Sequence, residues 1–273
     1  MSISFVVRKL SERFKFNYTE ALDFLHIKQR RGAGCSQSGN DYEKKIWNVL
    51  KHTTLNDKPF NTQAENTLAG SSAANDLECN LVGNRDIGIE VKKAKTPDWM
   101  QCSIKYKEGK WVGSARGKIP IASREIFNQL LSSITLFNGE IPPFFENKKI
   151  THEEWLQLKK EGKWKDHYIP IPNDIIRKLY RSKKCWYIQI SEFGLYHLGA
   201  DICGFGVPEF IVEQQMRIRI KVHKRETAKG FCALSVTAAC QPCDIRTLAK
   251  SPYSLDEFGT LPPALKVEET ALQ

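Results

Sequence analysis

The chain of 273 residues lacks any long apolar run. No window approaches the roughly 18 consecutive apolar residues that a membrane-spanning helix requires. The N-terminal stretch MSISFVVRKLSERF also has too short an apolar run before its charges to act as a secretion signal. We therefore expect a protein without membrane contact that stays inside the cell, in the cytoplasm or the nucleus.

The cysteines lack the spacing of a metal site. Eight are scattered through the chain, and Cys240 and Cys243 form its one CxxC pair. A structural zinc site needs four ligands, and no second CxxC or close Cys–His pair follows. Cys232 and His223 lie upstream and could complete a site, but buried or incidental thiols are the favoured interpretation. The six histidines show no metal-ligand spacing either.

Basic residues outnumber acidic ones. Lys and Arg number 41 against 31 Asp and Glu, which gives a formal net charge of +10. Such an excess favours a polyanionic partner, because Lys and Arg replace the counterions condensed on phosphates. A solvated basic surface without a partner is the alternative. No Ser/His/Asp arrangement, Walker loop or dinucleotide motif points to another enzyme class.

The hydrophobic periodicity predicts an α/β protein. We expect helices at residues 3–30, 41–52, 123–137, 151–161 and 172–182. We expect strands at residues 77–82, 87–94, 102–107, 110–115, 185–190, 194–199 and 216–224, and a loose tail after residues 262–263. Ser123 is the expected N-cap of one helix, and Thr151 and Glu154 are the expected capping box of another.

This order predicts a mixed central β-sheet flanked by helices, with an N-terminal helical appendage and a β-rich C-terminal half. Residues 1–38 form the appendage and a Gly- and Ser-rich loop. Residues 39–145 form a core around the hairpin of residues 77–94. Residues 146–273 supply the remainder of the core.

The hairpin carries the sharpest chemical signal. Asp76 opens its first strand, and Glu90 and Lys92 lie two apart on the second. Residues i and i+2 of a strand face the same side, so Glu90 and Lys92 project together while Ile89 and Val91 face the core. An uncompensated buried carboxylate is costly, and a divalent cation would offset that cost. A surface hairpin with a weak Glu90–Lys92 ion pair is the alternative.

Two carboxylates and a lysine suit phosphodiester hydrolysis. Hard oxygen ligands favour Mg²⁺, which usually binds one or two carboxylates together with waters and phosphate oxygens. Such an ion polarises the scissile phosphate and lowers the pKa of a bound water. A neighbouring lysine can bind the attacking water or stabilise the charge that builds on phosphorus.

Asn75-Asp76, then 13 intervening residues, then Glu90-Val91-Lys92 resembles the motif of the PD-(D/E)xK nuclease superfamily. The resemblance covers about residues 39–137 and implies a restriction-endonuclease-like core with the motif on its central hairpin. It implies that Asp76 and Glu90 hold Mg²⁺ and that Lys92 assists the attacking water. Glu43, on the preceding helix, would be an accessory acid. Gln101 resembles an extra polar residue that some members have on the next strand, and it would contact DNA.

The chain departs from this motif in some positions. Asn75 stands where the family name implies proline. Glu78, which shares a strand face with Asp76, and Asp86, in the turn, are rival acids. Lys93 could substitute for Lys92, but it faces the other side of a simple pleat.

A later strand is the candidate DNA-recognition element. Arg217, Arg219, Lys221 and His223 share one strand face, opposite the apolar face formed by residues 218, 220 and 222. Arg suits bidentate contacts with guanine and Lys suits phosphates. An exposed face of an antiparallel sheet is the alternative.

Two further groups of cations could contact DNA. Lys44 and Lys45, beside Glu43, could touch the duplex near the cut. A second basic cluster could hold backbone phosphate or be ordinary helix-terminus charge, and it comprises Arg177, Lys178, Arg181, Lys183 and Lys184.

Together these features predict a Mg²⁺-dependent endonuclease of double-stranded DNA, similar to type II restriction enzymes. A palindromic target would call for a homodimer. The N-terminal stretch resembles short helical segments of some large-DNA-virus proteins. The alternatives are a structure-specific repair or recombination nuclease or an exonuclease of the same fold, a non-catalytic DNA-binding protein, and a ribonuclease.

Overall fold

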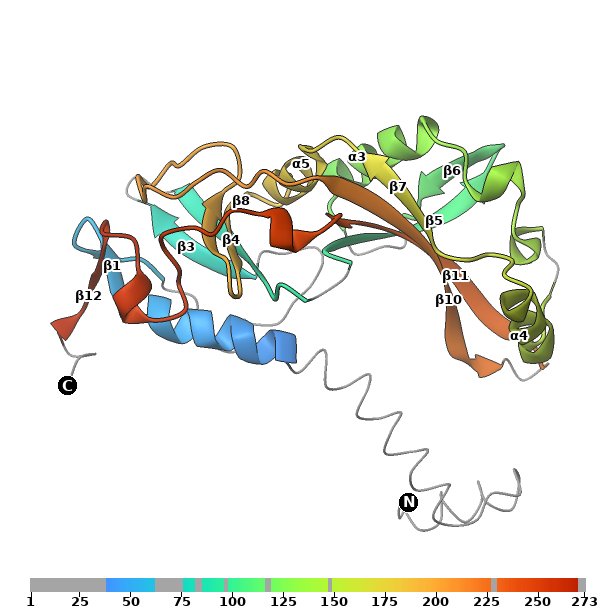
Figure 1. Cartoon of the computed structure of the whole chain (residues 1–273), viewed down its shortest axis with the longest axis horizontal. Coiled ribbons are helices and arrows are strands. Elements are labelled where there is room, and N and C mark those ends of the chain that lie inside the picture. The colour runs from blue at the N-terminus through green and yellow to red at the C-terminus, as the bar shows by residue number, and fades with distance from the viewer. Residues whose placement is uncertain are drawn as a thin grey trace, which may run out of the picture.

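The computed structural model describes residues 38–61, 76–81, 85–95, 98–115, 119–146, 149–226 and 230–269. The expected N-terminal appendage lies almost entirely outside the described residues. The described chain forms a mixed α/β fold with a four-stranded, a five-stranded and a three-stranded sheet (Figure 1). The predicted α/β class with a mixed sheet is therefore confirmed.

The four-stranded sheet contains the expected hairpin. Its order is β3 (Leu77–Leu81), β4 (Arg85–Lys92), β8 (Cys185–Ile190) and β9 (Gly194–His197). β3 runs antiparallel to β4, β4 runs parallel to β8, and β8 runs antiparallel to β9. The sheet is thus mixed, and a parallel crossover of more than ninety residues joins β4 to β8.

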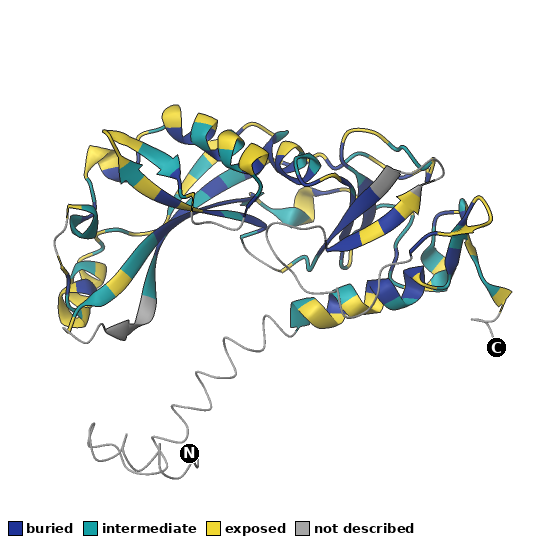
Figure 2. Cartoon of the chain, turned by 180° about the vertical axis from the view of Figure 1, so that it is seen from behind, coloured by how far each residue is buried: buried dark blue, intermediate teal, exposed yellow. Residues whose placement is uncertain are grey.

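The central strands of this sheet, β4 and β8, are buried on both faces. Residues 38–50 form a helix that covers one face, with Tyr42, Ile46 and Leu50 packed against Ile89 and Val91 in one apolar cluster. The spacing of those three helical residues places them on one side of a helix, and Figure 2 shows the buried side turned toward the sheet. On the other face, residues of β8 and β9 join a second apolar cluster. A sheet covered on both sides can hold charged residues only where they are paired.

The five-stranded sheet is antiparallel. Its order is β6 (Lys110–Gly113), β5 (Met100–Lys107), β11 (Cys232–Pro242), β10 (Gln214–Glu226) and β7 (His167–Ile171). The helices α3 (Ile121–Ser132) and α5 (Ile175–Arg181) pack on one side, in the same apolar cluster as alternate residues of β10 and β11. Figure 1 shows both helices on the upper side of the long β10–β11 ribbon, which bends downward toward α4 (His152–Lys160).

The residues after 262–263 were expected to form a loose tail, but part of this segment forms a strand of the third sheet. β12 (Leu265–Val267) pairs with β1 (Thr53–Leu55), which also pairs with β2 (Lys58–Pro59). Leu55 and Leu265 are buried in the cluster under the helix of residues 38–50. A three-residue strand has too few positions to show a period, so the sequence pattern did not reveal it.

The four expected helices that fall within the described residues are present with shifted ends, and the helix expected at residues 3–30 lies outside those residues. Ser123 was expected as the N-cap of α3, but α3 begins at Ile121, after Pro120. Ser123 therefore lies inside the helix, where its side chain is buried and its Oγ lies 2.6 Å from Ser182 Oγ. The capping box of Thr151 and Glu154 at α4 is confirmed. Four short 3₁₀ helices complete the described chain, at Phe137–Gly139, Pro143–Phe145, Ile245–Thr247 and Phe258–Thr260.

The sequence pattern did not predict the strands β7 and β11. β11 is built largely from small residues, so its sequence has little contrast between an apolar and a polar face. Cys240 is buried within this strand and Cys243 is exposed after it, and both carry free thiols. The five-stranded sheet takes strands from both sides of residue 145, the expected boundary between the core and its remainder.

Candidate active site

The hairpin brings Asp76, Glu90 and Lys92 into direct contact. The Lys92 Nζ atom lies 3.1 Å from Asp76 Oδ2 and 2.6 Å from Glu90 Oε1. The backbone N–H of Val91 donates to Asp76 Oδ2 at 2.9 Å. Asp76 is 7% exposed and Glu90 is 2% exposed, so this is a buried ionic cluster and not a solvated surface pair.

The strand pleat determines which side chains join the cluster. Ile89 and Val91 enter the apolar cluster under the helix, which turns Glu90 and Lys92 to the other face of β4. Lys93 points away from them, and its Nζ donates to Ser38 Oγ at 2.6 Å. Among the rival acids, Glu78 is exposed, and the side chain of Asp86 lies outside the described residues.

A second lysine, Lys183, completes the cluster. Its Nζ donates to Glu90 Oε2 at 3.0 Å, and both side chains are 3% exposed. The parallel pairing of β4 with β8 brings the turn before β8 next to Glu90. On the sequence alone, Lys183 belongs with the cations near the end of α5, because a lysine after a helix usually interacts with its C-terminal carbonyls. The long-range pairing of β4 with β8 places Lys183 beside Glu90, and the residues around Lys183 in the sequence do not indicate that pairing.

An aromatic residue borders both ammonium groups. Lys92 Nζ lies 5.9 Å and Lys183 Nζ lies 5.6 Å from the centre of the Tyr180 ring. The Tyr180 hydroxyl donates to the carbonyl oxygen of Trp99 at 3.0 Å, just before β5 begins. Tyr180 therefore links the ionic cluster to the five-stranded sheet.

Burial and mutual charge control the protonation of the cluster. Burial and the Asp76 charge raise the pKa of Glu90, and the ammonium groups of Lys92 and Lys183 oppose this rise. Although burial disfavours its charged form, the carboxylates of Asp76 and Glu90 raise the pKa of Lys92 well above its usual value. Lys92 is therefore an ammonium ion throughout the physiological pH range.

Glu43 approaches this cluster from the helix of residues 38–50. Its carboxyl is half-buried, and burial together with the charge of Asp76 raises its pKa to about 7. The charges of Glu90 and Lys92 also act on it, in opposite directions. The expected accessory acid thus lies within the electrostatic field of the hairpin residues.

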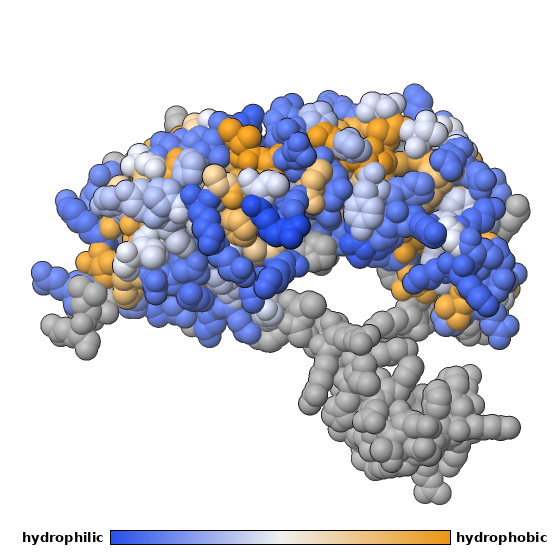
Figure 3. All heavy atoms as spheres, in the orientation of Figure 1, coloured by the Kyte–Doolittle hydropathy of each residue, from blue (hydrophilic) through white to orange (hydrophobic). Residues whose placement is uncertain are grey.

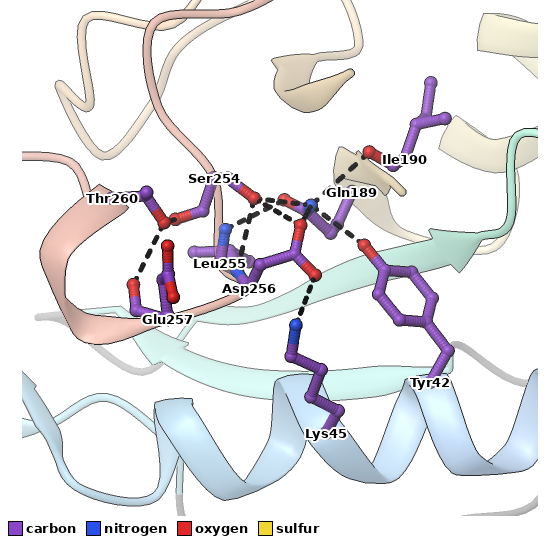
Figure 4. A network of polar contacts seen from close by, with 9 residues as sticks. All are labelled: Tyr42, Lys45, Gln189, Ile190, Ser254, Leu255, Asp256, Glu257 and Thr260. Carbon is purple, nitrogen blue, oxygen red and sulfur yellow. Dashed lines mark hydrogen bonds and ion pairs between the residues drawn. The ribbon is translucent and has the colours of Figure 1, made fainter. Parts of the chain in front are cut away.

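A buried polar network fixes that helix against the sheet (Figure 4). Gln189 of β8 donates from Nε2 to Tyr42 Oη at 3.1 Å and to Ser254 Oγ at 2.9 Å. Asp256, which accepts from Ser254 Oγ at 2.7 Å, also accepts from Lys45 Nζ at 3.2 Å. Because Tyr42 precedes Glu43, the network holds the helical turn that carries the accessory acid.

We predict that Glu43→Gln stabilises the fold in a pH-dependent way. A folded-state pKa of about 7 exceeds the unfolded value, so the ionisation of Glu43 disfavours the folded state as pH rises from about 4.5 to 7. After allowance for solvent screening, the variant should gain about 1–2 kcal/mol above pH 7. Urea denaturation at pH 5 and pH 8 tests this. Asp41→Asn, an exposed acid on the same helix, is the control, and an equal gain at both pH values would contradict the prediction.

The donor set fits a magnesium ion held by two carboxylates. In the described part of the chain, no group of three or more His, Cys, Asp or Glu side chains has the arrangement of a metal site. Asp76 and Glu90 nevertheless both direct an oxygen at one nitrogen, that of the Lys92 ammonium, so the two carboxylates surround a position that a cation occupies. Mg²⁺ commonly takes one or two carboxylate ligands from a protein and completes its coordination shell with water and phosphate oxygens.

Three of the expected DNA-contacting residues, Arg217, Arg219 and Lys221, lie on the face of the five-stranded sheet opposite α3 and α5. Met216, Ile218 and Ile220 are buried toward the helices, which turns Arg217 and Arg219 to the open face. The confirmed alternation does not leave these arginines unpaired. Asp98 forms ion pairs with both, at 3.5 Å to Arg217 and 2.6 Å to Arg219.

The other residues that were expected to contact DNA lie in different parts of the structure. Lys221 Nζ donates to Gln101 Oε1 at 2.7 Å, so Gln101 lies with the open face of this sheet and not with the carboxylates of the hairpin. The side chain of His223 lies outside the described residues. Lys44 is exposed on the helix that carries Glu43.

Comparisons with protein-family models, with curated proteins and with solved structures found no match. Within the described ranges, no helix is both long and apolar enough to cross a membrane.

Proposed function

We propose that this protein is a Mg²⁺-dependent endonuclease that hydrolyses phosphodiester bonds of double-stranded DNA. The observation that carries the proposal is the buried contact of Asp76, Glu90 and Lys92 at one end of the β3–β4 hairpin. Carboxylates are seldom buried in pairs without a compensating role, and perturbed ionisable groups gather at functional sites. The resemblance to the PD-(D/E)xK motif involves the same three residues.

Each residue has a role in this proposal. Asp76 and Glu90 would hold Mg²⁺, which when bound polarises the scissile phosphate and lowers the pKa of a bound water. The Lys92 ammonium would donate hydrogen bonds to the attacking water and to the phosphate oxygens as negative charge develops there. Glu43, with a pKa of about 7, is suited to accept a proton near neutral pH.

The duplex would lie on the open face of the five-stranded sheet. Arg217, Arg219 and Lys221 share this face with Ser103 and Lys105, because the register aligns β10, β11 and β5. Figure 3 shows the lower outline of the molecule hollowed between the helix of residues 38–50 and α4, on the side away from α3 and α5. The basic excess of the chain suits this partner.

The decisive experiment is digestion of unmethylated plasmid and genomic DNA with Mg²⁺ and with EDTA. Discrete fragments that disappear with EDTA support a sequence-specific, type II restriction-like enzyme. Smears or end-trimming indicate a structure-specific nuclease or an exonuclease. Intact DNA with a gel shift indicates a binding protein without cleavage, and cleavage of RNA alone indicates a ribonuclease. A palindromic target would call for a homodimer, and sedimentation of the protein with and without DNA tests for one.

We predict that Arg219→Ala weakens DNA binding and flattens its dependence on salt. Arg219 lies on the face proposed to contact the duplex, and we expect its guanidinium to neutralise a phosphate there. Removing one phosphate-binding cation lowers the slope of log K against log salt by about 0.9. Fluorescence anisotropy across a salt series measures this slope. Lys266→Ala is the control, because Lys266 lies in the three-stranded sheet and pairs with Asp57. Equal slopes for both variants and the unmodified protein would place the duplex elsewhere.

A further inference from the structure

Lys183 is a buried cation that lies outside the sequence motif. Its side chain is 3% exposed, and its Nζ contacts Glu90 Oε2 at 3.0 Å, whereas Lys92 contacts Glu90 Oε1 at 2.6 Å. Glu90 is therefore held at both oxygens by two different ammonium groups. Burial of a lysine is costly even when it is paired, so the contact calls for a role.

The position of Lys183 is fixed by the backbone around it. The N–H of Lys183 donates to the Tyr180 carbonyl at 2.9 Å, which closes the turn after α5. β8 begins two residues later and pairs in parallel with β4, with Glu90 opposite Ile188. The turn and the sheet thus present Lys183 to Glu90 as a rigid unit.

The two lysines also balance the charge of the two carboxylates. Asp76 and Glu90 contribute two negative charges, and Lys92 and Lys183 contribute two positive charges within hydrogen-bonding distance of them. A divalent cation entering this buried cluster meets both ammonium groups at short range, where repulsion is weakly screened.

We propose that Lys183 is a positioning residue of the active site, which orients the Glu90 carboxylate and limits the affinity of the free site for a divalent cation. The proposal rests on the proposed function, since it concerns the same carboxylates. It assigns Lys183 an effect on cation affinity that a merely structural ion pair would not have.

The test measures Mn²⁺ binding to the free protein by isothermal titration calorimetry. Lys183→Gln removes the charge but keeps a donor for Glu90, and Lys183→Arg keeps the charge. We expect Lys183→Gln to bind Mn²⁺ about tenfold more tightly, and Lys183→Arg to match the unmodified protein. Lys178→Gln is the matched control, because Lys178 is exposed on α5 and pairs with Asp174. We also expect kcat for cleavage to fall in Lys183→Gln while the Kd for DNA is unchanged.

Failure of this proposal is distinguishable from failure of the proposed function. If the unmodified protein cleaves DNA and a folded Lys183→Gln variant binds Mn²⁺ with unchanged affinity, the role of Lys183 is overturned and the function stands. If the unmodified protein cleaves no nucleic acid but Lys183→Gln still binds Mn²⁺ more tightly, Lys183 controls a cation site and the nuclease assignment is overturned. Should Lys183→Gln not fold, as judged by thermal melting, Lys183→Met replaces it in the same titration.

Discussion

Exchanging Lys92 for methionine is expected to lower the rate of plasmid cleavage by about a thousandfold and to leave a folded protein that binds DNA. The ammonium of Lys92 contacts both carboxylates, at 3.1 Å from Asp76 and 2.6 Å from Glu90. Its loss removes the group proposed to stabilise charge on the phosphate. Asp76 keeps the N–H of Val91 and Glu90 keeps Lys183, so each carboxylate retains a partner.

Lys93 provides a matched control for this variant. It neighbours Lys92 in the sequence, but its side chain crosses to the other face and contacts Ser38. Lys93→Met should therefore cleave at nearly the unmodified rate. Single-turnover cleavage with Mg²⁺, together with thermal melting, compares the two variants. Equal rates for Lys92→Met and the unmodified protein would remove Lys92 from the chemistry and, with it, the main support for the nuclease assignment.

The sequence predicted the hairpin well because the hairpin is local. The period of two along residues 87–92 determines which side chains share a face, and the structure places Ile89, Val91, Glu90 and Lys92 on the expected faces. Asp76 could be joined to them because a short turn leaves few registers. The amphipathic pattern of residues 41–52 predicted a helix there for the same reason, since the pattern depends only on neighbouring turns of one helix.

The features that the sequence did not reveal depend on long-range pairing. Lys183 meets Glu90 because β4 and β8 pair in parallel across a long crossover, and nothing near Lys183 signals that pairing. The pairing of β1 with β12 joins the two ends of the described chain in the same way. Gln101 was expected as a DNA-contacting residue on the strand after the hairpin, but that strand, β5, belongs to the other sheet. Strand order is a property of the whole chain, and local periodicity does not encode it.

Removing Glu90 is expected to abolish cleavage and to destabilise the fold, because it leaves a buried cation without its carboxylate. Glu90→Ala would leave the 3%-exposed Lys183 without the carboxylate that it contacts. Breaking a buried ion pair on one side costs about 3–5 kcal/mol. Urea denaturation should show this loss in the free energy of unfolding. Glu78→Ala is the control, since Glu78 is exposed on the same hairpin and its loss should cost about 0.5 kcal/mol or less.

The double variant Glu90→Met, Lys183→Met tests whether the loss arises from the unpaired charge. Replacing both members of a buried ion pair by apolar side chains of similar volume is often neutral or stabilising. Ile188, Ile190 and Tyr180 line this region and would accept the two methionine side chains. The double variant should therefore recover most of the stability that Glu90→Ala loses, while remaining unable to cleave DNA. Additive losses from the two sites would show instead that the pair has little energetic coupling. Recovery of stability without recovery of cleavage would mean that Glu90 is buried here for its chemistry, since the fold is no less stable without this ion pair.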